Sequence, residues 1–581
     1  MMKNSLLRYG LLALTAMTLT AFNPVSSLAT GISDTVHNLS AGGPGTVKAL
    51  QEGELCIFCH TPHHGRTDAS YLWNRNDSTA NYTTYQSSTL KAAVGQPTGS
   101  SKLCLSCHDG TVALGLLGSR PTEIPFVGGL RFMPPGPDLL GTDISASHPV
   151  SLVYNTALAT SSGNSLADPA NLPARIHLDK NQELQCTACH DPHDDSYGNF
   201  LVMSNKNSAL CVSCHTRPGW ATGSHDISTA VWNGVGADPW PNSTYTTVAA
   251  NGCLNCHKVH HAGIAPRLLK RSPEEDNCLV CHDGNVAKTN IASELIKTSG
   301  HKVQNFFGIH DPAEDFTTGT VAKHVECFDC HNGHQANGKA GAVLGAPPVV
   351  SGANAGVSGI DISGNPVKYA TYTYEICFKC HSKTQMFGSS PLNRQINQQN
   401  TRLEFNPANP SFHPVAGLGV NQDVPSLISP LTPQSRIDCI SCHNNSSASG
   451  PKGPHGSDYP FILTAQYSTA DLTTESANSY ALCYKCHSRA TLLTPQMMMH
   501  YTDFPHYLHV VRQKAPCGAC HDPHGISNTQ GNAVNNSHLI NFNIDIVSPD
   551  PQGRLYYERL GAFKGRCFLK CHGQVHNGFT Y

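Results

Sequence analysis

The sequence has few charged residues and few of the largest apolar ones. Charged side chains make up 13% of the 581 residues, with 38 Lys and Arg against 40 Asp and Glu, and there are only 4 Trp and 9 Met. A typical soluble domain has about 25% charged residues. The net charge of −2 provides no basic field for nucleic acid or an anionic membrane, so we expect neither as a partner. The 50 Gly and 38 Pro predict that much of the chain is loop.

Long apolar runs are missing beyond the N-terminus. Lys3 and Arg8 precede an apolar stretch that ends at Phe22, and small residues follow up to Ala29. This pattern predicts a secretory signal peptide over residues 1–29, since the run is shorter than the about 20 apolar residues that a membrane helix needs. We therefore expect a mature chain without an integral membrane segment, secreted across the cytoplasmic membrane to the periplasm, the outer surface or the extracellular space.

Cysteine and histidine are the residues in excess, with 24 Cys and 33 His. The cysteines form twelve close pairs, and a histidine directly follows the second member of each pair. The pairs are Cys56 and Cys59, Cys104 and Cys107, Cys186 and Cys189, Cys211 and Cys214, Cys253 and Cys256, Cys278 and Cys281, Cys327 and Cys330, Cys377 and Cys380, Cys439 and Cys442, Cys483 and Cys486, Cys517 and Cys520, and Cys567 and Cys571. A disulfide framework gives no reason for a histidine after every pair, so this alternative is disfavoured.

The spacing is that of covalent haem attachment, because CxxCH supplies two thiols for the porphyrin vinyl groups and one axial ligand for the iron. We predict twelve haem c groups. Their proximal ligands would be His60, His108, His190, His215, His257, His282, His331, His381, His443, His487, His521 and His572. The last motif has three residues between Cys567 and Cys571, so a disulfide or a free thiol pair is the alternative there; His572 favours haem.

The other histidines follow a repeat. In five of the six odd-numbered motifs a second histidine stands three residues after the first, whereas at His443 an insertion moves it to His455. A further histidine precedes each pair of motifs, and for the last pair it is either His506 or His509. The predicted distal ligands are His37, His63, His148, His193, His225, His260, His301, His334, His413, His455, His509 and His524. His177 and His324 are the main alternative candidates for distal ligands.

The repeat predicts six two-haem units, each touching mainly its neighbours, in an elongated array. The units would span residues 30–147, 148–224, 225–300, 301–412, 413–505 and 506–581. We expect a haem-cored chain that is mostly loop, with short α-helices at the attachment motifs and little β-structure. Residues 128–141 and 338–356 would be surface loops, and a small hairpin around Gly364 would join Ile360–Ile362 to Tyr372–Tyr374.

The chain resembles the doubled-CXXCH multihaem cytochromes of metal-respiring bacteria. The resemblance rests on Cys56–His63, Cys186–His193, Cys517–Gly525 and the His-Pro-Val elements at His148 and His413. It implies bis-histidine haems, little regular structure and electron transfer in respiration directed toward the cell exterior. The sequence departs from the pattern after His443 and at Cys567.

A carrier rather than an enzyme is predicted, since no CxxCK variant marks a catalytic haem and the histidines suffice for every iron. Its partners would be other redox proteins or extracellular electron acceptors, and the weak surface charge would permit a homo-oligomer or filament. The alternative function is a multihaem reductase with one open-site haem.

Overall fold

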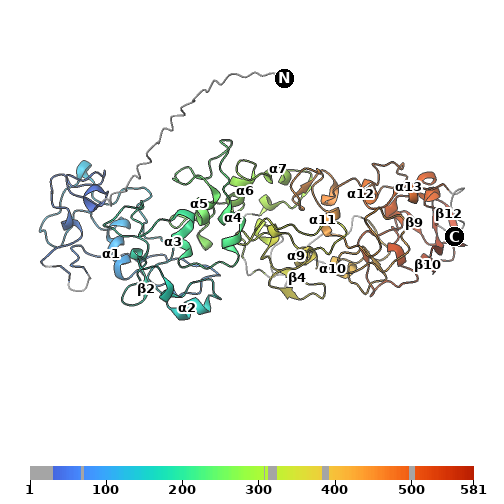
Figure 1. The fold of residues 1–581 in the computed structure, drawn as a ribbon, viewed down its shortest axis with the longest axis horizontal. Helices are drawn as coiled ribbons and strands as arrows, with labels where there is room; N and C mark the ends of the chain where they lie inside the picture. The colour runs from blue at the N-terminus through green and yellow to red at the C-terminus, as the bar shows by residue number, and fades with distance from the viewer. Residues whose placement is uncertain are drawn as a thin grey trace, which may run out of the picture. The chain divides into compact units, whose positions relative to one another are not determined.

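The computed structural model describes residues 31–63, 65–66, 71–306, 308–311, 314, 324–382, 392–495 and 504–581. The predicted signal peptide lies outside the described residues. Short helices and very short strands are joined by long loops (Figure 1). This confirms the prediction of a mostly loop chain with little β-structure. In the part of the chain that the structure describes, no helix combines the length and hydropathy needed to cross a membrane.

The α-helices are short, and several coincide with attachment motifs (Figure 1). They are α1 (Gly99–His108), α2 (Thr156–Ser161), α3 (Ala209–Val212), α4 (Ser224–Ile227), α5 (Val248–Asn251), α6 (Asp276–His282), α7 (Ala292–Leu295), α8 (Cys327–Cys330), α9 (Thr373–His381), α10 (Thr401–Glu404), α11 (Cys439–Cys442), α12 (Ala481–Tyr484) and α13 (Arg489–Leu492).

Odd and even motifs occupy different local structures. Each odd motif is a single turn beginning at or just before its first cysteine, as in α8, α11 and the 3-10 turns at Cys56–Phe58, Cys186–Ala188, Gly252–Asn255 and Cys517–Ala519. The second, fourth, sixth, eighth and tenth motifs lie in helices that begin two or more residues before the first cysteine, namely α1, α3, α6, α9 and α12. One helical turn places the two thiols on the same side, which suits attachment to one porphyrin edge.

Most strands form two-residue antiparallel ribbons. The pairs are β1 (Leu152–Val153) with β2 (Glu183–Leu184), β3 (Ser299–Gly300) with β7 (Gly456–Ser457), β4 (Gly359–Ile360) with β5 (Pro366–Val367), and β6 (Ser411–Phe412) with β8 (Gly525–Ile526). The hairpin expected around Gly364 is β4–β5. Its second strand is Pro366–Val367 rather than Tyr372–Tyr374, because Thr373 already starts α9 with Tyr372 as its N-cap.

A larger antiparallel sheet lies at the C-terminus (Figure 1). It consists of β9 (Val547–Ser548), β10 (Tyr556–Gly561), β11 (Lys564–Cys571) and β12 (Gln574–Thr580), with β11 pairing the other three. The sequence prediction of a helix at every motif is therefore wrong for the last one, since Cys567 and Cys571 lie on β11. Phe568 and Leu569 are neighbours on β11 and both are buried, so each face of this strand has a packed side chain.

Apolar packing in the described residues is divided among small clusters. One contains Ile360, Tyr374, Phe378, Phe405 and Val415. Another, beneath the C-terminal sheet, contains Ala519, Phe542, Val547, Tyr557 and Leu569. Clusters of this size provide little hydrophobic stabilisation for so long a chain, which is consistent with bound macrocycles supplying most of the buried apolar surface.

The chain divides into two compact units. The first comprises Met1–Arg75, Leu114–Arg131 and Cys189–Val202, and the second comprises Asn76–Ala113, Phe132–Ala188 and Met203–Tyr581. All contacts discussed below lie within one unit or the other.

Candidate haem-binding sites

All 24 cysteines are described, and none forms a disulfide. The structure therefore gives no support to a disulfide framework. Most are partly buried, with only Cys56 exposed. Partly buried thiols in closely spaced pairs are what covalent attachment to a cofactor edge requires.

The motif histidines face second imidazoles across a constant gap. The facing pairs, with their ring-centroid distances, are His60 and His193 at 6.1 Å, His148 and His215 at 6.1 Å, His225 and His282 at 6.3 Å, His257 and His334 at 6.1 Å, His301 and His381 at 6.4 Å, His331 and His455 at 5.9 Å, His443 and His524 at 6.1 Å, and His506 and His521 at 6.4 Å. Two imidazoles bound to one metal through bonds of about 2 Å have centroids about 6 Å apart, so these residues fit a six-coordinate haem iron.

His413 lies near His487, the motif histidine of the tenth motif. Burial, followed by the nearby His413, lowers the pKa of His487 to about 4. Burial, followed by the imidazole that each faces, likewise lowers the pKa of His215 to about 3 and of His282 to about 4. These imidazoles are therefore neutral near pH 7, which is the form that binds a metal. His524 differs, because the Glu404 carboxylate raises its pKa against the effect of burial.

The second ring nitrogen of several of these histidines has its own hydrogen-bond partner. The Nδ1–H groups of the odd proximal histidines donate to backbone carbonyls, as from His60 to Tyr71 at 2.7 Å and from His443 to Phe461 at 2.7 Å. Distal histidines do the same, with His225 donating to Gly333 at 3.0 Å and His148 to Pro149 at 3.0 Å. A donating Nδ1–H leaves the Nε2 lone pair for iron and fixes the ring plane.

Ring orientation separates the two series. Odd pairs are nearly parallel, with interplanar angles of 18° for His60 and His193 and 6° for His257 and His334. Even pairs are steeply inclined, as at 73° for His148 and His215. An odd pair that departs from this is that of His443 with His524, at 52°. There, the His524 ring is held by the Glu404 carboxylate at 2.9 Å instead of a backbone carbonyl.

A left-handed turn holds five of the odd proximal histidines and was missed by the sequence reasoning. Two consecutive non-glycine residues of positive φ follow each motif, and the carbonyl of the first accepts the Nδ1–H bond. These are Tyr71 and Leu72, Asn199 and Phe200, Arg267 and Leu268, Phe461 and Ile462, and His538 and Leu539. The second carbonyl accepts a backbone N–H bond from the residue after the histidine, as from Asn444 to Ile462. The available signal was a large aliphatic or aromatic residue at the second position, followed by a third apolar residue.

We expect Phe461→Pro to destabilise the protein, because Phe461 has φ 59° and proline requires about −65°. Such an incompatible substitution costs more than about 1 kcal/mol. The Phe461 side chain is 53% exposed, so loss of its ring contributes little. Thermal unfolding of the holoprotein measures the effect. Phe461→Asn is the matched control, since asparagine adopts the left-handed region readily. Equal melting of the proline variant and the wild type would contradict the role of this turn.

Backbone pairing determines which distal histidine lies beside which. We call the histidine that precedes each pair of motifs the lone histidine. The backbone at a lone histidine is hydrogen-bonded to the backbone beside the second histidine of a later odd motif. The ribbon β3–β7 joins the residues beside His301 and His455, and β6–β8 joins those beside His413 and His524. Likewise, the N–H of Ser224 donates to Ala336, which places His225 beside His334. One ribbon therefore holds two histidines that face the motif histidines of two consecutive motifs.

The facing pairs show which haems these are. His301 and His455 face His381 and His331, which are the two motif histidines of one predicted unit. His225 and His334 face His282 and His257 in the same way. The lone histidine thus lies opposite the even motif that follows it. The histidine of the later odd motif lies opposite the odd motif of the preceding unit.

This rule accounts for both ends of the chain. The last unit has no later motif, and both of its distal candidates come from the π-helical turn Tyr507–Arg512 and the residue before it: His506 faces His521, and His509 faces His576 at 6.1 Å. The sequence prediction had to choose between His506 and His509, whereas in the structure each of the two faces another histidine. His63 belongs to the first odd motif, which has no preceding unit, and it is exposed.

The last motif differs from the prediction in a second respect. His572 lies in the turn after β11 with φ 50°, and its Nε2 contacts the Asp471 carboxylate at 2.8 Å. The histidine opposite His509 is His576 on β12. Four residues along an extended strand span about 13 Å, so β11 does not bring the Cys567 and Cys571 thiols together as one helical turn does.

The thiols of successive motifs lie against one another. The first cysteine of an even motif is within hydrogen-bonding reach of the first cysteine of the next odd motif. These pairs are Cys104 and Cys186, Cys211 and Cys253, Cys278 and Cys327, Cys377 and Cys439, and Cys483 and Cys517. Since thioether sulfurs are attached at the porphyrin edge, neighbouring sulfurs imply neighbouring haem edges.

The remaining cysteines place thiols of an odd motif near thiols of the even motif that follows it. Burial raises the pKa of the thiol in each case, and a thiol of the adjoining motif adds to the rise. The neighbours are Cys256 and Cys281, Cys330 and Cys380, Cys442 and Cys486, and Cys520 and Cys571. From the fourth motif to the twelfth, every motif is therefore next to the one that follows it.

Attachment motifs, facing imidazoles and adjoining thiols together define a multihaem c-type cytochrome with covalently bound haem c. In comparison with family models, residues 179–219 and 246–287 match the doubled CXXCH motif, and residues 367–532 match the outer membrane cytochrome MtrC/MtrF-like domains II/IV. These matches cover parts of the chain and support a multihaem c-type cytochrome with one segment similar to the MtrC/MtrF-like domains. The search of curated proteins found no match.

Proposed function

We propose that this protein is a twelve-haem electron carrier that conducts electrons through bis-histidine haems in extracytoplasmic respiration. The observation that carries the proposal is the uninterrupted adjacency of attachment motifs from Cys211 to Cys571. Bound haem supplies the one-electron chemistry. Adjacent haem edges permit electron transfer from one to the next without a diffusing carrier.

The residues of the chain would orient the haems and protect them. Buried imidazoles would occupy both axial positions of each iron, which would leave no site for a substrate to bind iron. The backbone carbonyls that accept the Nδ1–H bonds hold each ring at a fixed angle. We therefore propose a carrier rather than an enzyme. A reductase would need one iron with an unoccupied axial position.

We assign the distal ligands from the backbone pairing of the histidine segments and from the imidazoles that face one another. His193, His334, His455, His524 and His506 serve the odd haems of His60, His257, His331, His443 and His521, and His148, His225, His301 and His413 serve the even haems of His215, His282, His381 and His487. On the sequence repeat alone, His37 and His260 are left for the haems of His108 and His190. The twelfth iron would lie between His509 and His576.

The cellular setting follows from the matched family and from the N-terminus. The MtrC/MtrF-like model describes outer membrane cytochromes, and residues 1–29 have the pattern of a signal peptide. We propose a periplasmic or extracellular location. The partners would be redox proteins or extracellular electron acceptors. The low surface charge would permit assembly into a homo-oligomer or filament.

The mass of the mature holoprotein and its spectra test this proposal. We expect a mass that corresponds to twelve haems and cleavage after Ala29, with absorption spectra of low-spin iron only. Electron paramagnetic resonance should resolve two low-spin classes, because odd haems have nearly parallel imidazoles and even haems have inclined ones. A high-spin component, or rapid binding of carbon monoxide to a ferrous haem, would instead favour the reductase.

A further inference from the structure

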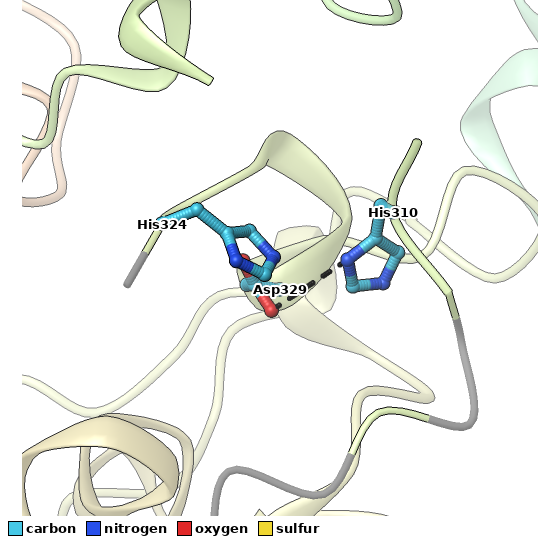
Figure 2. Close-up of side chains that lie close together, drawn as sticks. All are labelled: His310, His324 and Asp329. Carbon is cyan, nitrogen blue, oxygen red and sulfur yellow. Dashed lines mark ion pairs between the residues drawn. The ribbon is translucent and has the colours of Figure 1, made fainter. Parts of the chain in front are cut away.

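Two buried histidines are left without a haem. His310 and His324 face each other with ring centroids 6.4 Å apart, and neither faces a motif histidine among the described residues, although the sequence made His324 an alternative distal ligand. They lie together with Asp329 of α8, and the three possible ligand atoms fall within 4.8 Å of one another (Figure 2). The His310 ring and the Asp329 carboxylate point toward the same small space (Figure 2).

The distances around this space are those of a coordination site. His310 Nδ1 lies 3.9 Å from Asp329 Oδ1 and 3.6 Å from Glu314 Oε1, and His324 Nε2 lies 3.0 Å from Glu314 Oε2. A tetrahedral ion with bonds of about 2 Å separates its ligand atoms by about 3.3 Å. Two imidazoles and two carboxylates therefore fit around one ion with small adjustments.

These groups are withdrawn from water and incompletely satisfied. His310 is 7% exposed and Asp329 is 3% exposed, and neither His310 Nδ1 nor Asp329 Oδ1 makes a hydrogen bond. The other Asp329 oxygen already accepts the Glu326 N–H at 2.7 Å, so Oδ1 remains directed at His310. Unbonded buried polar atoms are costly, and a metal ion would satisfy several of them at once.

The local charge also favours a cation. Glu274, Glu275 and Glu326 are buried near the cluster in addition to Glu314 and Asp329, while Arg267 forms an ion pair with Glu274 at 3.2 Å. Among the described residues around the cluster, the buried carboxyl groups outnumber the arginine that pairs with one of them.

The positions of the ligands are held by independent contacts. The N–H of His310 donates to Glu274 at 2.9 Å, and the Arg267 guanidinium donates to the His310 carbonyl. The His324 ring stacks on Phe306 at 4.1 Å. Asp329 lies on α8 between Cys327 and Cys330, so an ion here would tie this haem-bearing turn to the chain around His310.

We propose that His310, His324, Asp329 and Glu314 bind one non-haem divalent transition-metal ion, which we take to be Zn²⁺. Imidazole and carboxylate ligands in tetrahedral arrangement suit zinc. The site would be structural, since the ion would link α8 to the preceding segment without a redox change or contact with a substrate. None of the four ligands is a motif cysteine or an imidazole that faces a motif histidine, although Asp329 lies within the seventh motif.

Zinc binding by the full-length holoprotein tests the site. After treatment with a chelator, the protein is titrated with Zn²⁺ against a competing zinc indicator, and bound zinc and iron are counted by elemental analysis. We expect the wild type to bind one more Zn²⁺ per chain than the double variant His310→Gln, His324→Gln, with zinc raising the melting temperature of the wild type only. His177→Gln is the control, because His177 is an exposed histidine outside the cluster. It should bind zinc as the wild type does.

Two results would overturn the site: equal zinc stoichiometry and affinity in the wild type and the double variant, or no zinc binding by the wild type. Iron content, measured on the same samples, shows whether the variants have acquired their haems. If the double variant loses haem, Glu314→Gln replaces it, and this single change is expected to weaken zinc binding at least tenfold. Unchanged affinity in Glu314→Gln would then contradict the proposal.

Discussion

Replacing His576 with alanine is expected to open one axial position, leaving a single high-spin haem among otherwise low-spin haems. The reason is the arrangement at the C-terminal sheet, where His576 faces His509 with ring centroids 6.1 Å apart. That separation equals those of the other facing pairs, whereas His572 contacts Asp471 instead of an imidazole. The new high-spin signal should appear in the absorption and electron paramagnetic resonance spectra, and carbon monoxide should bind the ferrous form.

His572→Ala is the matched control, since the two histidines are four residues apart and lie on either side of one turn. We expect this variant to remain fully low-spin when its haem content equals that of the wild type. The opposite pattern, with a high-spin haem in His572→Ala and none in His576→Ala, would show that His572 is the iron ligand. A wild-type mass of only eleven haems would remove the twelfth haem altogether.

Removing a haem from the middle of the row is expected to lower electron transfer along the chain by orders of magnitude. The double variant Cys377→Ser, Cys380→Ser removes both thioethers of the eighth motif. Its thiols lie between those of the seventh and ninth motifs, with Cys330 on one side and Cys439 on the other. Because tunnelling rates fall steeply with edge-to-edge distance, the gap left by one haem should interrupt conduction. The measurement is conductance across films of oriented protein.

The control removes a haem at one end of the row, through Cys567→Ser, Cys571→Ser. Both variants lose one haem at most, so equilibrium electron capacity falls by a similar amount in each. Only the internal variant should lose conductance between the parts of the row on its two sides. Similar conductance in the two variants would show that electrons do not pass from haem to haem along the order of the motifs.

The chemistry of the protein could be predicted from the sequence because it resides in local patterns. Cysteine spacing and the histidine that follows specify haem attachment within five residues, and one helical turn is enough to realise it, as in α8 and α11. The two kinds of motif were likewise visible, since only the odd ones carry a histidine three residues on. The hairpin at Gly364 was located for similar reasons, although its second strand was misplaced.

The tertiary structure determines which histidines face one another. The partners of a single iron can be more than a hundred residues apart, as are His60 and His193, and the ribbon β3–β7 brings together segments that no local signal connects. The strand conformation of Cys567–Cys571 also depends on pairing with β10 and β12 rather than on the motif itself. The sequence by itself determined what each cysteine and histidine can bind. Long-range backbone pairing determined which histidines face one another, because pairing energy depends on segments that only the folded chain brings into contact.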